Sequence, residues 1–192
     1  MAWGMFAGER IMKNLIIILI ALLQLGCSKK ENTMDNSQKM HHYLGIEMNM
    51  QTWNLLTKKN RNDQDDTRMV YFAKASNYHW KESPQFEPIN EQRGEWLISH
   101  VYAVLGHGEN ALDHAQSCMN LTKKHAFKDF DLAYAYEGMA RAYAALNNST
   151  KMEKYFLLAK EAGDSIQSEE DKKMFFSDLH NGPWYECLKT ED

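Results

Sequence analysis

From Tyr43 onward, apolar residues recur at spacings of three and four, which is the period of an amphipathic helix. The first stripe is formed by Ile46, Met50, Trp53 and Leu56. No segment of useful length alternates with a period of two residues, so the pattern predicts an all-α fold. The further helices are expected over residues 67–80, 90–105, 111–119, 132–146, 152–162 and 168–179.

Proline, glycine and capping residues mark the helix ends. Pro88 is expected to interrupt the helical pattern before the third helix, and Asn90 is the predicted N-cap of that helix. The sequence Gly106-His107-Gly108 is typical of a helix end. Asp131 is the predicted N-cap of the fifth helix. Ser168, followed by three acidic residues, is expected to open a last helix that closes the exposed end of the core.

The helices pair, and the pairs repeat. The first helices align at Trp53, Glu95 and Tyr136, with offsets of 42 and then 41 residues. A fixed period with two helices in each unit indicates a solenoid of stacked hairpins. In the second helices, Met69 aligns with Ala111 and Met152, Ala73 with Ala115 and Phe156, and Ser76 with Cys118 and Ala159.

This pattern resembles the tetratricopeptide repeat family. A large residue is followed by a Leu-like one and then by Tyr102 or Tyr143, and small residues stand in the second helix of each pair. The first unit departs from the pattern, because Asn60 replaces the tyrosine. The period also exceeds the family's usual length of about 34 residues, which implies longer loops or helices. The resemblance implies a solenoid of about three pairs plus a C-terminal capping helix, and the alternative is an unrelated helical bundle.

The N-terminal region carries an export pattern. Met12-Lys13-Asn14 precedes an uncharged run of eleven residues, 15–25. A membrane-spanning helix needs about 20 apolar residues, so this run suits a signal peptide better than a permanent anchor. Residues 1–11 add no basic region, which favours Met12 as the true start.

The run ends in Gly26-Cys27 followed by a polar segment, which resembles the lipobox of bacterial lipoproteins. The resemblance implies that the thiol of Cys27 receives diacylglycerol and that cleavage makes Cys27 the first mature residue. Gln24 departs from the family's usual leucine, so an ordinary signal peptide or an N-terminal buried helix stays open. Ser28, in place of the aspartate that retains lipoproteins at the inner membrane, favours the outer membrane.

These patterns divide the chain into three parts. Residues 1–26 are the predicted signal peptide, 27–42 a lipidated flexible tether, and 43–187 the helical domain. The protein is therefore expected to be exported and lipid-anchored in a bacterial cell envelope, because an acylated cysteine of this kind holds a protein at a membrane.

The net charge argues against a nucleic-acid partner, and the cysteine content bears on disulfide bonds. The net charge of −4 offers no strongly basic face, so no nucleic-acid partner is expected. With Cys27 lipidated, Cys118 and Cys187 remain. They could pair in an oxidising periplasm. Cysteines so far apart are more often unpaired, and Cys118 lies on an apolar stripe that predicts a buried thiol.

The resemblance also suggests where a partner would bind, because the first helices of such repeats line a concave groove that holds an extended peptide or a helix. We therefore expect an adaptor for another envelope protein or peptide. Trp96 and Tyr134 could instead pack against the neighbouring unit, and Arg141 could pair with Glu137 four residues earlier. The candidate groove residues are Arg93, Trp96, His100, Tyr134, Glu137 and Arg141.

The histidines predict neither a metal site nor catalysis. His100, His107 and His114 lie seven residues apart, but the glycines beside His107 interrupt the helix, so the three do not share a face. No nucleophile motif, phosphate loop or cofactor motif is present. The alternative reading is a small envelope enzyme or ligand-binding protein that uses His79 and His100 in a pocket. A third is a role in oligomerisation.

Overall fold

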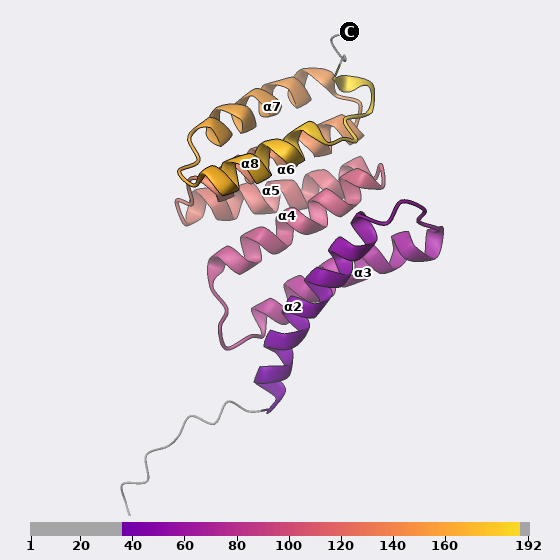
Figure 1. Cartoon of the computed structure of the whole chain (residues 1–192), viewed down its shortest axis with the longest axis vertical. Coiled ribbons are helices and arrows are strands. Elements are labelled where there is room, and N and C mark those ends of the chain that lie inside the picture. Colours follow the sequence, from indigo (N-terminus) through magenta and orange to yellow (C-terminus); the bar gives the residue numbers. More distant parts are fainter. Residues whose placement is uncertain (1–35, 189–192) are drawn as a thin grey trace, which may run out of the picture. The chain divides into compact units, whose positions relative to one another are not determined.

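The computed structural model describes residues 36–188, so the predicted signal peptide and Cys27 lie outside the described residues. Within 36–188 every regular element is helical, which confirms the all-α prediction. None of these helices is long and apolar enough to span a bilayer. The elements are α2 (Asn36–Leu56), α3 (Asp63–Lys81), α4 (Pro88–Val104), α5 (Gly108–Lys124), α6 (Phe130–Ala145), α7 (Ser149–Asp164), α8 (Glu169–His180) and the 3₁₀ helix η1 (Tyr185–Cys187) (Figure 1).

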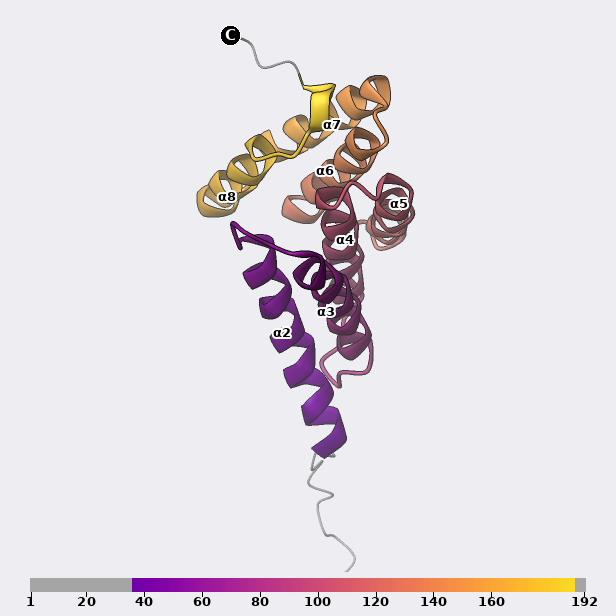
Figure 2. The same ribbon diagram turned by 90° about the vertical axis from the view of Figure 1, so that its right-hand side faces the viewer.

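Consecutive helices pack as hairpins. α2 packs on α3, α4 on α5 and α6 on α7, and the hairpins join through α3–α4 and α5–α6 contacts. α4 also contacts α6 directly, whereas α8 packs on α6 and α7. Figure 2 shows α2 and α8 on one side of this stack and α5 on the other. The described residues therefore form a helical-repeat-like arrangement.

The aligned positions of the second helices form the core, as the repeat predicts. Met69 and Ala111 are 0 % exposed and Met152 is 1 % exposed. Small side chains at the next aligned positions let helices approach closely. The Ser76 hydroxyl, for example, donates to the carbonyl of Gly45 on α2 at 2.7 Å. The other aligned residues, Ala73, Ala115, Ser76, Cys118 and Ala159, are all buried, and Phe156 is partly buried.

Several predicted helix boundaries are wrong. α4 begins at Pro88 with Glu87 as its N-cap, because proline is well suited to the first helical position, where its missing N–H is not needed. Asn90 lies inside the helix, and its side-chain oxygen accepts from the Glu87 N–H at 2.7 Å. α6 begins after Asp129, which places Asp131 in the first turn. The Ser168 N-cap is confirmed, since its hydroxyl accepts from the N–H of Asp171.

The N-terminal helix also begins earlier than the sequence pattern suggested. α2 starts at Asn36, so residues 36–42, which were expected to belong to the tether, are helical. His41 and His42 therefore lie on α2.

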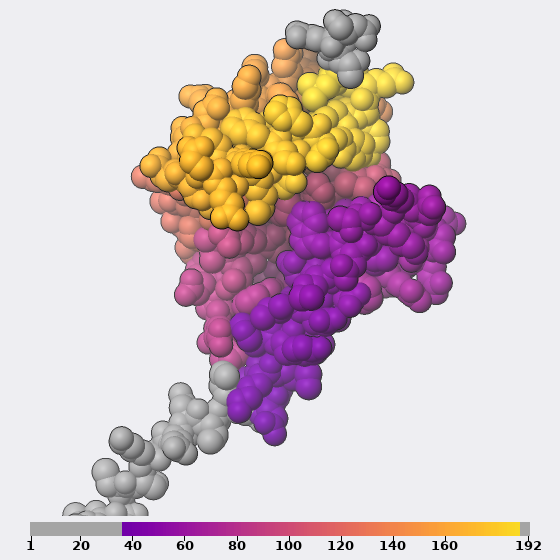
Figure 3. Space-filling model, viewed as in Figure 1, coloured from indigo at the N-terminus to yellow at the C-terminus, as the bar shows by residue number. Residues whose placement is uncertain are grey.

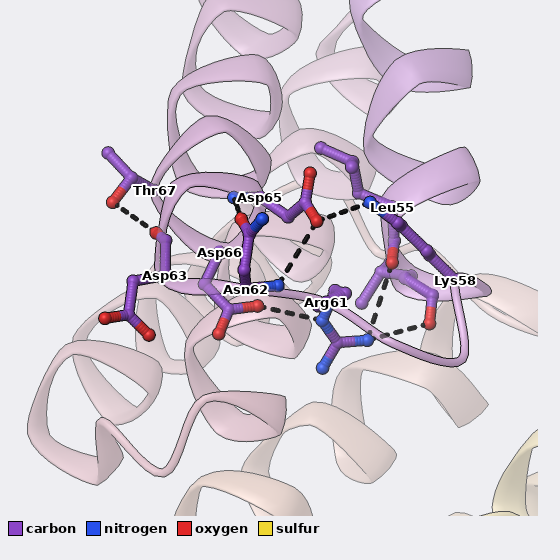
Figure 4. A network of polar contacts seen from close by, with 9 residues as sticks. Leu55, Lys58, Arg61, Asn62, Asp63, Asp65, Asp66 and Thr67 are labelled. Carbon is purple, nitrogen blue, oxygen red and sulfur yellow. Dashed lines mark hydrogen bonds and ion pairs between the residues drawn. The ribbon is translucent and has the colours of Figure 1, made fainter.

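The turn between α2 and α3 is held by a polar network (Figure 4). The Asn62 side chain accepts from the N–H of Asp65 at 2.9 Å, and the Asp65 carboxylate accepts from the N–H of Asn62 at 3.2 Å. The ammonium of Lys58 lies 2.5 Å from Asp65. Its hydrogen bond, followed by that from the Asn62 backbone, holds the pKa of Asp65 below its ordinary value. This capping box fixes the start of α3.

Arg61 closes the other side of the same turn. Its guanidinium donates to the carbonyls of Leu55 at 3.4 Å and Leu56 at 3.1 Å at the C-terminal end of α2, and the Leu55 carbonyl also accepts from the N–H of Lys58. It also pairs with Asp66 at 2.8 Å. Arg61 therefore lies beside the end of α2 (Figure 4).

Candidate functional site

A cavity of about 440 Å³ lies among α2, α4, α6 and α8. Four aromatic side chains line it, and we call it the aromatic compartment. Its residues are Asn49, Trp53, Gln92, Arg93, Trp96, Leu97, Phe130, Asp131, Tyr134, Met174 and Asp178.

A second cavity of about 460 Å³ adjoins the first, and we call it the arginine compartment. Trp53 and Asp178 line both cavities, so the two are neighbours, and together we call them the α2–α8 cleft. Figure 3 shows α2 and the C-terminal helix on the same face, with the central helices visible between them. The arginine compartment is lined by Trp53, Leu56, Thr57, Arg61, His100, Val104, Arg141, Asp178, Asn181, Gly182 and Pro183.

Stacked rings form the floor of the cleft. The Trp96 indole stacks on His100 with ring centroids 5.2 Å apart and meets Tyr134 edge-on at 4.8 Å. Trp53 on α2 faces both Trp96 and His100, at 6.1 and 6.0 Å. The Trp96 indole packs closely against Gly138 of α6, where an added Cβ atom would lie 3.2 Å from the ring. The absence of a side chain at Gly138 therefore allows this close packing of the ring on α6.

A buried ion pair lies behind these rings. Arg141 pairs with Glu137 one turn earlier on α6, and their side chains are 2 % and 0 % exposed. The second oxygen of Glu137 accepts from the Trp96 indole N–H at 2.8 Å. Glu137 thus orients the central ring of the cleft and compensates the charge of Arg141. A buried pair of this kind depends on both partners, because either charge alone would be strongly unfavourable.

Arg141 also anchors the end of α8. One of its terminal nitrogens donates to the carbonyls of Asp178 at 2.7 Å and Asn181 at 2.9 Å. Its guanidinium lies 4.6 Å from the ring centre of Trp184. The Asp178 carbonyl also accepts from the N–H of Asn181, so Arg141 adds a second hydrogen bond at the C-terminal end of α8. The position of α8, and so of one cleft wall, depends on Arg141.

Tyr134 provides a second link to α8. Its hydroxyl donates to the Asp178 carboxylate at 2.7 Å. Burial, followed by this hydrogen bond to Asp178, raises the pKa of Tyr134, so the phenol remains protonated and continues to donate. The carboxylate that lines both compartments is thereby held in place.

At the mouth of the aromatic compartment, Arg93 pairs with Asp131 at 2.7 Å. The hydrogen bond to Asp131 raises the pKa of Arg93. The Arg93 side chain is 56 % exposed, so it is accessible to a partner. Beside it, the amide nitrogen of Gln92 donates to the Thr122 hydroxyl and to the Asp131 carbonyl, each at 3.1 Å. Asp131, predicted to be an N-cap, instead joins α4 to α6.

Three buried polar atoms in residues that line the cleft have no hydrogen-bond partner among the described residues. They are the Oε1 atom of Gln92, the Nδ1 atom of His100 and the Nη1 atom of Arg141. Buried polar groups are usually satisfied, because an unmade hydrogen bond costs free energy. Gln92 belongs to the aromatic compartment, and the other two belong to the arginine compartment.

His100 lies in the arginine compartment, and its Nδ1 atom has no hydrogen-bond partner among the described residues. Its Nδ1 lies 4.0 Å from Glu137, which is beyond hydrogen-bond distance. Burial, and secondly the charge of Arg141, lower the pKa of His100 well below its ordinary value, so the ring is neutral. His79 lies on α3 and pairs with His41, so the described contacts do not bring the two histidines of the alternative enzyme reading together.

The six predicted groove residues all belong to this region. Arg93, Trp96 and Tyr134 line the aromatic compartment, and His100 and Arg141 line the arginine compartment. Glu137 is completely buried, so it acts through its neighbours. Trp96 does pack on the neighbouring unit, and Arg141 does pair with Glu137. The lining residues that sequence reasoning did not assign to the site include Asn49, Trp53, Arg61, Gln92, Met174 and Asp178.

The two cysteines of the described region are free. Cys118 is buried, as its stripe predicts, and burial raises the pKa of its thiol to about 12. It is therefore an inert packing residue.

Comparison with known proteins gives no match to a family model, a curated protein or a solved structure.

Replacing the buried carboxylate tests the ion pair. We expect Glu137→Gln to lower the free energy of unfolding by about 3–5 kcal/mol, because Arg141 would be left buried without a counter-charge. Denaturant unfolding measures this change. The matched control, Glu153→Gln on the exposed surface of α7, should change it by less than about 0.5 kcal/mol. A loss below about 1 kcal/mol in Glu137→Gln would contradict the role given to the pair.

The burial of His100 predicts a pH dependence. Its pKa in the folded protein lies below the ordinary value of about 6.5, so the unfolded chain binds a proton first as the pH falls. The stabilisation is complete above about pH 6.5 and declines below it by up to about 1.4 kcal/mol per pH unit. His100→Phe keeps the stacked ring and removes the proton site. Its unfolding free energy should therefore decline less between pH 7 and 5, and parallel curves would refute the assignment.

Proposed function

We propose that this protein is a lipid-anchored adaptor that holds a segment of another envelope protein, or a peptide, in the α2–α8 cleft. The finer fold proposal is a tetratricopeptide-like solenoid. It is supported by the hairpin packing and by the burial of the aligned positions Met69, Ala111 and Met152. The observation that carries the function is the pair of adjoining cavities, which gather rings and polar side chains from helices far apart in the sequence.

The aromatic compartment suits an apolar or aromatic side chain of the partner. Trp53, Trp96, Phe130 and Tyr134 present ring surface, and Met174 on α8 is a large apolar residue that is 50 % exposed. Aromatic residues, methionine and arginine are enriched at protein interfaces. Centrally placed aromatic and arginine side chains commonly contribute most of the binding energy. An anchor residue in this compartment would also bury the exposed Met174.

The polar groups of the cleft suit an extended main chain beside that anchor. The Arg93 side chain is 56 % exposed and can donate to carbonyl groups of a bound segment, and the side-chain amide of Asn49 can both donate and accept. A peptide segment carries both N–H donors and carbonyl acceptors, so its main chain complements these side chains.

The lipid anchor supplies the other half of the proposal. Tethering through Cys27 would confine the domain to a membrane surface and raise its effective concentration for partners held there. The outer membrane is the favoured location, since Ser28 rather than Asp follows Cys27. The proposed function therefore combines partner binding in the cleft with attachment to a membrane.

Charge insertion into the cleft tests the binding surface. A photo-cross-linking residue placed at Asn49 in the full chain should label a partner in envelope preparations. We expect Met174→Glu to reduce this labelling by about tenfold or more, because it places a charge against the apolar anchor. The measurement is the yield of the cross-linked species, and its site on the partner is mapped by mass spectrometry.

The matched control is Leu157→Glu on α7, which also replaces an exposed apolar residue, 57 % exposed, but lies outside the cleft. Its labelling should equal that of the unchanged protein. Equal labelling in Met174→Glu would remove the cleft as the binding site. In the same preparations, Cys27→Ala should leave the membrane fraction, and its retention there would remove the lipid anchor.

A further inference from the structure

Away from the cleft, two histidines on different helices face each other near the N-terminal end of the described region. The Nδ1 atom of His41 on α2 lies 2.9 Å from the Nδ1 atom of His79 on α3. Their ring centroids are 5.0 Å apart, and the rings are tilted by 50°. Both side chains are partly exposed, so solvent reaches the pair. The sequence analysis did not connect them, because they are 38 residues apart.

The two helices that carry this pair are held in fixed register. The Ser76 hydroxyl bonds to the Gly45 carbonyl, one turn along each helix from the histidines. Gly45 also packs directly against the Trp80 indole, where an added Cβ atom would lie 3.2 Å from the ring. His42 does not compete with the pair, because its Nδ1 is bonded to the Ser83 hydroxyl at 3.1 Å. The two nitrogens are therefore preorganised by the hairpin.

The distance between the nitrogens is compatible with one shared ligand, either a proton or a metal ion. Two neutral imidazoles at this distance share one proton in a hydrogen bond, and the same distance matches two ligands of one metal ion. Nitrogens about 2.05 Å from a metal and at right angles to each other are about 2.9 Å apart, whereas tetrahedral zinc sets them about 3.3 Å apart. Right-angled nitrogen and oxygen coordination is typical of Cu²⁺ and Ni²⁺, of which Cu²⁺ binds more tightly.

We propose that His41 and His79 form a two-histidine site for Cu²⁺, with water in the remaining coordination positions. Among residues 36–188, no group of three or more His, Cys, Asp or Glu side chains is arranged for a metal ion, so the protein supplies only this pair. The proposal departs, at these two residues alone, from the sequence-based expectation of no metal site.

A bound ion would join α2 to α3, and its binding would weaken at low pH because metal ligands must be unprotonated imidazoles. Since α2 packs mainly on α3, the ion would also steady the helix that forms one wall of the cleft. This consequence does not depend on what the cleft binds.

The test is a titration of Cu²⁺ alone into the full chain at pH 7, followed by calorimetry and electron paramagnetic resonance. We expect one site whose spectrum shows coupling to two nitrogens, together with a higher melting temperature. His41→Gln and His79→Gln should each weaken binding by about tenfold or more and leave one coupled nitrogen. The matched control, His125→Gln on an exposed residue after α5, should bind as the unchanged protein does.

Three results would overturn the proposal. One is unchanged affinity in both His41→Gln and His79→Gln, another is tighter binding of Zn²⁺ than of Cu²⁺ at this pair, and the third is the absence of binding below millimolar Cu²⁺. Far-ultraviolet circular dichroism confirms that each variant is folded before the titration. Met174→Glu should retain the copper site, which separates this test from that of the cleft.

Discussion

The pairing of Glu137 with Arg141 is the interaction on which the cleft depends. Both side chains are almost fully buried, so neither charge is tolerable without the other. From this pair, Glu137 reaches forward to the indole of Trp96 and Arg141 reaches across to the last carbonyls of α8. One turn of α6 therefore fixes both the floor of the cleft and one of its walls.

The two walls differ in how they are supported. α8 is fixed by Arg141, by the Tyr134–Asp178 hydrogen bond and by close packing on α7, where a side chain at Gly163 would overlap the ring of Phe175. α2 packs mainly on its hairpin partner α3, with Arg61 closing the turn between them. Because α2 packs mainly on one helix, the cleft stays open between α2 and α8. The histidine pair lies on this same hairpin, where a bound ion would reinforce the less supported wall.

Much of this arrangement is readable in the sequence, for identifiable reasons. The period of the apolar positions predicts the helices and the buried stripe of Met69, Ala111 and Met152, because side-chain hydrophobicity and helical period are both local properties. Helix starts were harder. Proline at the first position of α4 looks like a breaker, and Asp131 looks like a cap until its partner Arg93 is placed. The contribution of α8 was out of reach, since Met174 and Asp178 meet the cleft only through the tertiary fold. Complete burial of a glutamate is likewise rare enough that sequence alone argues against it.

The most direct measurement of the central claim is hydrogen exchange across the helices of the Glu137→Gln variant. If the ion pair fixes α8, amides of residues 169–180 should lose protection far more than those of the α2–α3 hairpin, because only α8 is anchored by Arg141. Equal loss of protection in both regions, or unchanged protection of α8, would contradict the account.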